Sequence, residues 1–127
     1  MPVTVEYTDQ FSAWWDTLSI PHQEATSRAV QALVKHGVRL GFPHSSAVKS
    51  SRHSHMRELR IQTRPRIRVF YAFDPRRSAI LLVGGHKTSG ERFYRDYVHQ
   101  ADTLYDEHLL ELSIETSPHS PQEGPTS

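Results

Sequence analysis

The stretch from residue 56 to residue 83 constrains the fold most, because it contains three strand-like segments separated by two short turns that contain proline. In residues 56–62 and 67–73, apolar side chains alternate with polar ones, a period of two that predicts strands with one face toward a core. Residues 79–83 are a continuous apolar run, typical of a central strand buried on both faces. Prolines in the turns fit hairpin connections. The stretch therefore predicts a small, mostly antiparallel sheet.

Helical patterns lie on the N-terminal side of these strands. Residues 3–7 alternate as in a half-buried strand, and Thr8 or Asp9 can cap a helix that runs through residues 11–18. Pro21 is placed to open a second helix in its first turn, and a glycine at position 37 or 41 to end it. The two helices are expected to form a hairpin.

The C-terminal part is predicted to be one long helix followed by a tail. The helix is expected from about residue 90 to residue 112, with its buried side formed by Phe93, Tyr97, Ala101, Leu104 and Tyr105. The resulting fold class is α+β: an N-terminal strand and helical hairpin packed on a small mostly antiparallel sheet, followed by a C-terminal helix, in two layers. Residues 1–112 form the domain, and residues 113–127, rich in Ser, Thr and Pro, are expected to be a disordered tail.

Positive charge is concentrated on the predicted strands. The net charge is only +1, yet seven of the 15 Lys and Arg side chains lie between Arg57 and Arg77. In a two-layer fold, alternation leaves four charged side chains on an open, concave sheet face, namely Glu58, Arg60, Arg66 and Arg68. A local basic patch on a near-neutral chain favours an anionic partner, of which nucleic acid is the commonest polyanion in a cell.

Composition excludes several other classes. The chain has no cysteine, which excludes disulfides, thiolate zinc sites and cysteine nucleophiles and suits a cytoplasmic protein. Its nine histidines show no metal-ligand spacing, so we expect neither a metal nor another cofactor. No signal peptide or membrane-length apolar run is present, and no membrane partner is expected.

The ordered motifs MRELR, RIRVFY, AILLVGGHK and FY resemble the RelE/ParE toxin superfamily, in its phage-derived HigB-like branch. The resemblance covers about residues 56–105 in motif, and the strand-helix-helix start agrees in order. It implies a RelE-like fold and the toxin of a type II toxin–antitoxin module. It further implies a ribosome-dependent mRNA endonuclease that inhibits translation, with a cognate antitoxin of the helix-turn-helix, HigA-like kind as partner besides the mRNA on the ribosome.

RNA cleavage without a metal uses the 2′-OH of the substrate as nucleophile. The enzyme must align this hydroxyl, remove its proton, neutralise charge on the phosphorane and protonate the leaving 5′-oxygen. Arginine suits the electrostatic part because it can grip a phosphate through two N–H groups. The resemblance implies catalytic positions at Arg68, Lys87 and Tyr94, and Arg60 and Glu58 on the preceding strand are further candidates. Other arginines are expected to bind RNA. The catalytic set is Arg68, Lys87, Arg60, Glu58 and Tyr94, and the RNA-binding set is Arg57, Arg64, Arg66 and Arg92.

Each of these residues also has a plainer interpretation, and the chain departs from the pattern of RelE itself. Met56 and Glu58 stand where RelE carries lysines, so Glu58 acts either as a general base or only to orient arginines. Tyr94 fits a core position as well as a leaving-group role, and His86 fits an acid–base role or a polar turn.

Two other functions stay open on the same fold. A ParE-like toxin inhibits DNA gyrase by binding, which would leave Arg68 and Lys87 dispensable. A non-catalytic nucleic-acid-binding relative would have no toxicity.

Overall fold

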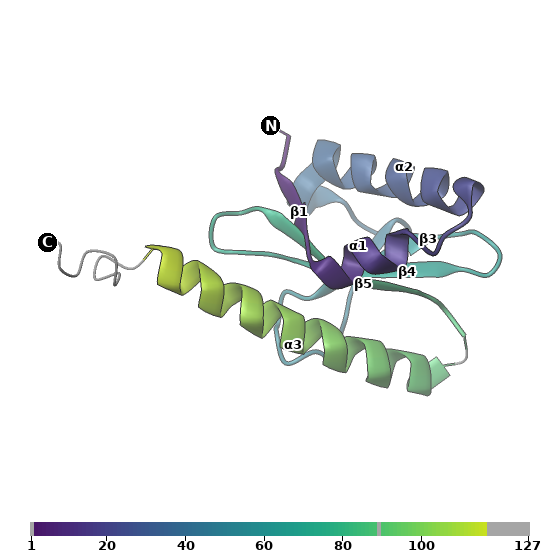
Figure 1. Cartoon of the computed structure of the whole chain (residues 1–127). Helices are drawn as coiled ribbons and strands as arrows, with labels where there is room; N and C mark the ends of the chain where they lie inside the picture. Colours follow the sequence, from purple (N-terminus) through teal and green to yellow (C-terminus); the bar gives the residue numbers. More distant parts are fainter. Residues whose placement is uncertain (1, 89, 117–127) are drawn as a thin grey trace, which may run out of the picture.

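The computed structural model describes residues 2–88 and 90–116. One five-stranded sheet lies between two helical layers (Figure 1). Helices α1 (Asp9–Trp15) and α2 (Ile20–His36) cover one face, and the long α3 (Gly90–Thr116) packs on the other. The α+β class and the order of elements are confirmed. The expectation of two layers with an open sheet face is wrong.

The sheet has the strand order β1-β5-β4-β3-β2. All neighbours are antiparallel except β1 and β5, which run parallel. This arrangement puts the short strand β1 at one edge and β2 at the other. The bounds are β1 Val5–Tyr7, β2 Ser45–Ala47, β3 Arg57–Ile61, β4 Ile67–Phe73 and β5 Ala79–His86, and a single 3₁₀ turn, η1 (Gly37–Arg39), follows α2.

The helical hairpin begins as its sequence predicts, but α1 ends at Trp15 and not at residue 18. Thr8 accepts a hydrogen bond from the Phe11 backbone N–H through its side chain and so caps α1. Ser19 caps α2, a proline occupies the first turn, and Gly37 ends the helix at a φ of 57°. Both helices pack on the apolar face of β3, β4 and β5, where the core contains Leu33, Leu59, Ile61, Ile67, Val69, Tyr71 and Leu81.

The second face is also apolar over most of its area, which explains why α3 covers it. Phe70, Ala72 and Leu82 point to this face and pack with the α3 residues Phe93 and Ala101. Left open, these side chains would expose a large apolar surface to water, at a cost of about 25 cal/mol per Å². The helix extends further than predicted, so residues 113–116 belong to α3 and not to a tail; residues 117–127 of the predicted tail lie outside the described residues.

A β-bulge in β5 determines toward which face of the sheet the last residues of this strand point. Phe70 pairs with Val83 whereas Tyr71 pairs with Leu81, so Leu82 is the extra residue. Beyond the bulge the alternation is shifted by one position. As a result Gly85 lies on the α3 side, opposite Arg68 in the ladder.

The two glycines after the bulge make room for aromatic rings. A Cβ at Gly84 would lie 2.5 Å from the ring of Trp14, and a Cβ at Gly85 would lie 2.5 Å from the ring of Tyr97. These two glycines therefore allow α1 and α3 to pack tightly on β5.

Gly84→Ala is expected to lower the free energy of unfolding by about 1–3 kcal/mol, because the new methyl group must displace the Trp14 ring. The matched control is Gly41→Ala, where the nearest atom to the added Cβ is 3.8 Å away. Urea unfolding followed by tryptophan fluorescence measures both. Equal stability of the two variants would contradict the tight packing of α1 on β5.

Candidate functional site

The five residues expected to be catalytic meet between the sheet and the first turns of α3. Glu58 and Arg60 come from β3, and Arg68 comes from β4, directly opposite Arg60 in the ladder. Lys87 follows β5, and Tyr94 comes from α3. The alternation of the strands puts the β3 and β4 side chains on the same face, and the bulge puts Lys87 there too.

Glu58 is the centre of the cluster. Its Oε1 accepts a hydrogen bond of 2.7 Å from the Tyr94 hydroxyl, and its Oε2 accepts one of 2.8 Å from the Ser46 hydroxyl. Arg60 Nη1 lies 3.4 Å from Oε2, and Arg68 Nε lies 3.6 Å from Oε1. With a side chain only 6% exposed, Glu58 is a buried carboxylate held between two guanidinium groups.

Arg68 is buried. The sequence predicted that it lies on an open sheet face, and that prediction is wrong. The residue is 1% exposed, because α3 lies over it. Its Nη1 donates to the Ile67 carbonyl at 3.1 Å, but its Nε has no hydrogen-bond acceptor among the described residues, and neither does Nε of Arg60. Two buried N–H groups are therefore left for an anion that reaches the cluster.

Tyr94 and Lys87 form the outer side of the cluster. Burial raises the pKa of the Tyr94 phenol above its usual value, the hydrogen bond to Glu58 raises it further, and Arg68 partly opposes both. The phenol therefore keeps its proton at neutral pH. Lys87 Nζ lies 5.8 Å from the centre of the Tyr94 ring, and the Lys87 backbone N–H donates to the Arg66 carbonyl at 2.7 Å.

The arginines expected to bind RNA divide into two groups. Arg64 and Arg66 are exposed around the turn between β3 and β4, and Arg92 is exposed on the first turns of α3. Arg66 lies next to Lys87 in the continued ladder, whereas Arg92, two residues before Tyr94 in α3, lies on the outer side of that helix. Arg57 instead faces the opposite side of β3, where its Nε donates to the Ser45 hydroxyl at 3.0 Å.

His86 also points away from the cluster. Its ring lies 5.6 Å from the ring of His22 on α2, and its buried Nε2 has no partner among the described residues. An acid–base role for His86 beside Lys87 is therefore wrong, since successive residues of a strand face opposite sides.

Sequence reasoning missed two neighbours of the cluster. Ser46 pairs with Glu58 across β2 and β3 and donates a hydrogen bond to it. Phe42 is 76% exposed, and the Arg60 guanidinium lies over its ring at 5.2 Å. Both lie in residues 42–55, rich in Ser and His, where no local pattern indicates a contact with a distant strand.

A second polar cluster has its hydrogen bonds satisfied and fits a structural role. The fully buried Asp74 carboxylate lies 2.7 Å from Nη2 of Arg76 and 2.9 Å from Nε2 of His108, and it accepts a hydrogen bond from the Ser78 N–H. These contacts fasten the turn between β4 and β5 to α3. Within the described ranges, no group of three His, Cys, Asp or Glu residues could hold a metal ion.

Asp74 should make the free energy of unfolding depend on pH in the acid range. Burial would raise its pKa, but hydrogen bonds from His108 and Arg76 outweigh burial and hold the pKa below the usual value. A lowered folded-state pKa gives stability that is complete above the unfolded-state pKa, about 4, and is lost as the pH falls through the folded-state value. We expect Asp74→Asn to be destabilised at pH 7 by about 1–3 kcal/mol and the difference from wild type to shrink below about pH 4. Urea unfolding at a series of pH values measures this, and a difference that does not change with pH would contradict it.

No described helix is long and apolar enough to cross a membrane.

The fold is that of RelE. The structure matches the Escherichia coli toxin RelE, in a double arginine-to-alanine mutant in the free state, with a TM-score of 0.59, 11% identity and coverage of 79% of this chain and 98% of that one. It also matches the Mycobacterium tuberculosis toxin–antitoxin complex RelBE2 with a TM-score of 0.55, 17% identity and coverage of 68% of this chain and 100% of that one. At such identities the likeness shows the fold alone.

Sequence comparison gives the family. Residues 13–106 match the family described as phage derived protein Gp49-like (DUF891), and the chain belongs to this family. It is 36% identical to the M. tuberculosis protein named toxin HigB2 over 107 residues, which cover 82% of this chain and 53% of that protein. It is 35% identical to the one named toxin HigB3 over 94 residues, which cover 73% of this chain and 82% of that protein. The phage-derived, HigB-like resemblance is confirmed, although the chain spans only about half the length of HigB2.

Proposed function

We propose that the chain is the toxin of a type II toxin–antitoxin module and inhibits translation by cleaving mRNA on the ribosome. The observation that carries this proposal is the cluster around Glu58, in which a buried arginine, whose Nε has no hydrogen-bond acceptor among the described residues, lies beside a neutral tyrosine and a lysine. Relatives named as toxins and the RelE fold support the same class.

Each group has a role in cleavage by the 2′-OH. Arg68 and Arg60 bind the non-bridging oxygens of the scissile phosphate through their free N–H groups. Lys87 neutralises the charge that develops on the phosphorane. Glu58 accepts the proton of the 2′-OH, and Tyr94 donates its proton to the leaving 5′-oxygen. The products are a 2′,3′-cyclic phosphate and a free 5′-OH, and no metal takes part.

The phosphate approaches from the side of Arg60, Lys87 and Tyr94, since these three are half-buried and Arg68 is enclosed. Exposed Arg64 and Arg66, at the turn before β4, would bind the flanking RNA backbone, and Arg92, on the outer side of α3, would contact RNA further from the cluster. A ribosomal target places the protein in the cytoplasm.

The partner in the cell is a cognate antitoxin. One of the matching solved structures is a toxin–antitoxin complex, which supports such a partner for this chain. From the HigB-like family we expect a HigA-like, helix-turn-helix antitoxin that also binds operator DNA.

Cleavage of a defined mRNA on programmed ribosomes tests this function. We expect the wild-type chain to cleave, and Lys87→Ala to cleave about 100-fold more slowly, because it loses a charge needed in the transition state. Lys35→Ala, at an exposed position in the last turn of α2 on the other face of the sheet, is the control and should keep the wild-type rate.

A parallel assay of DNA supercoiling separates the alternatives. Inhibition of gyrase without mRNA cleavage would assign the chain to the ParE-like branch. Neither activity would leave a non-catalytic nucleic-acid-binding relative.

A further inference from the structure

The edge strand β1 offers an unpaired backbone. β1 ends the strand order and pairs with β5 only. The Thr4 carbonyl accepts from Ala79 N–H, and the Thr8 N–H donates to the Leu81 carbonyl, so these two residues direct their groups inward to β5. In a parallel ladder alternate residues direct both backbone groups to the same side, so Glu6 also faces β5, whereas Val5 and Tyr7 face the open edge. Such an edge is a template for another strand.

An apolar groove follows this edge on the side of the helical hairpin. It has a volume of about 270 Å³ and is lined mainly by Val5, Tyr7, Phe11, Trp15, Val30 and Leu81. Tyr7 is 64% exposed although its ring packs at 6.0 Å from that of Phe11. The groove thus leaves a large aromatic surface in water beside unpaired backbone groups.

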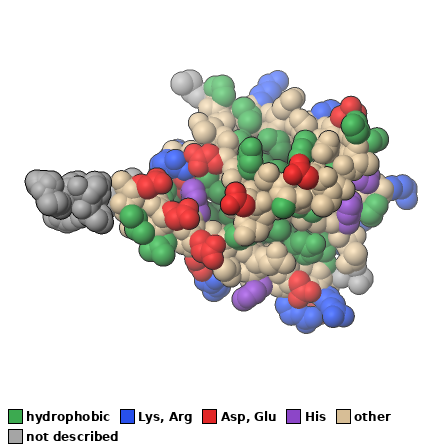
Figure 2. All heavy atoms as spheres, in the orientation of Figure 1, with side chains coloured by type: hydrophobic (Ala, Val, Ile, Leu, Met, Phe, Trp, Pro, Cys, Tyr) green, Lys and Arg blue, Asp and Glu red, His purple; other side chains and the backbone are tan. Residues whose placement is uncertain are grey.

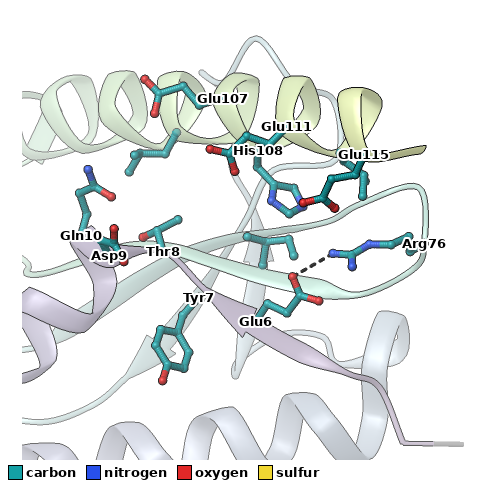
Figure 3. A pocket seen from close by; sticks show the side chains of 13 residues that line it. Glu6, Tyr7, Thr8, Asp9, Gln10, Arg76, Glu107, His108, Glu111 and Glu115 are labelled. Atoms are coloured by element: carbon teal, nitrogen blue, oxygen red, sulfur yellow. Dashed lines mark hydrogen bonds and ion pairs between the residues drawn. The ribbon is translucent and has the colours of Figure 1, made fainter. Parts of the chain in front are cut away.

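An acidic groove follows the same edge on the side of α3. It has a volume of about 380 Å³, and its five carboxylates face one arginine and one histidine. Figure 3 shows Glu6 pointing toward Arg76 in this groove, while the neighbouring Tyr7 points to the other side. In Figure 2, acidic side chains gather on this face of the molecule. The carboxylates belong to Glu6, Asp9, Glu107, Glu111 and Glu115, and the basic groups to Arg76 and His108.

We propose that the β1 edge binds an extended segment of a partner protein in which apolar and basic side chains alternate. The main chain of this segment pairs with Val5 and Tyr7 as a sixth strand, beside β1. Because successive side chains of a strand face opposite sides, one set enters the apolar groove and the other set meets the carboxylates. The segment can be longer than the three residues of β1, since the acidic groove continues along α3 to Glu115.

Charge selects this occupant over others. A second copy of the chain paired edge to edge would bring two sets of carboxylates together, which repel. A nucleic acid would meet the same carboxylates with its phosphates. The surface also lies at the opposite edge of the sheet from β2, whose Ser46 contacts the candidate catalytic cluster, so it is independent of RNA cleavage.

Binding of two labelled heptapeptides to the full chain tests the proposal. One alternates, Lys-Val-Arg-Val-Lys-Val-Arg, and the other has the same composition in blocks, Lys-Arg-Lys-Arg-Val-Val-Val. By fluorescence anisotropy at physiological salt, we expect the alternating peptide to bind at least about tenfold more tightly. We also expect it to slow hydrogen exchange of the Val5 and Tyr7 amides.

Charge reversal on α3 supplies the second measurement. The double variant Glu107→Lys/Glu111→Lys should weaken binding of the alternating peptide at least about tenfold. The control, Asp16→Lys/Glu24→Lys, changes the net charge equally at exposed positions outside both grooves and should bind as wild type does. Equal affinity for the two peptides, or equal loss in both double variants, would show general attraction of cations and overturn the proposal. Unchanged exchange at Val5 and Tyr7 with the peptide bound, or dimerisation of the chain through this edge in place of peptide binding, would overturn it as well.

Discussion

Glu58→Ala is expected to lower the free energy of unfolding by about 3–5 kcal/mol, the cost of leaving a buried charge without its partner. Arg68 is 1% exposed and has no other carboxylate within ion-pair distance among the described residues. Removal of Glu58 also takes the hydrogen-bond acceptor from Tyr94 and from Ser46. Urea unfolding followed by tryptophan fluorescence measures the loss.

Two further variants separate charge from shape. Glu58→Gln keeps an acceptor for only one of the two hydroxyl groups and loses the charge, and it should lie between wild type and Glu58→Ala. Glu24→Ala, on the exposed side of α2, should change stability by less than about 0.5 kcal/mol. If Glu58→Ala were as stable as Glu24→Ala, the carboxylate could not be holding the two guanidinium groups in place.

Arg68→Lys is expected to slow mRNA cleavage about 100-fold while the protein stays folded. Lysine keeps the positive charge next to Glu58, but it lacks the planar fork that binds two phosphate oxygens at once. The Nε of Arg68, which has no hydrogen-bond acceptor in the described part of the chain, is the group that the substitution removes. Single-turnover cleavage on programmed ribosomes measures the rate.

Arg39→Lys is the matched control, because Arg39 is exposed in η1, after α2, and does not contact the cluster. Its cleavage rate should equal that of wild type. A wild-type rate in Arg68→Lys would mean that charge alone suffices at this position and that the bidentate contact is not used.

The strands were predictable because their signal is local. Alternation in residues 56–62 and 67–73 correctly predicted which side chains of β3 and β4 meet the helical hairpin. The third layer was not predicted, although residues 79–83 already indicated a strand covered on both faces. Phe70 carried the same signal, since it sits between Arg68 and Ala72 on the face that α3 covers.

The candidate site could be predicted only in part, because its geometry depends on pairing between distant segments. The motifs indicated Glu58, Arg68 and Tyr94, and in the structure Tyr94 and Arg68 both contact the Glu58 carboxylate. The bulge at Leu82 could not be deduced from the sequence, yet without it Lys87 would face the opposite side of the sheet. The contact of Ser46 with Glu58 also depends on the pairing of β2 with β3, for which the loop-like sequence before β3 gave little indication.

Induced expression in a bacterium, with transcript 5′-ends mapped genome-wide, tests the proposed mRNA cleavage and the role of Arg68 most directly. We predict growth arrest with new 5′-ends inside translated codons in the wild type, and the loss of both in Arg68→Lys expressed at the same level. Arrest with intact mRNA, or the same new ends in the variant, would contradict the assignment of RNA cleavage to this cluster.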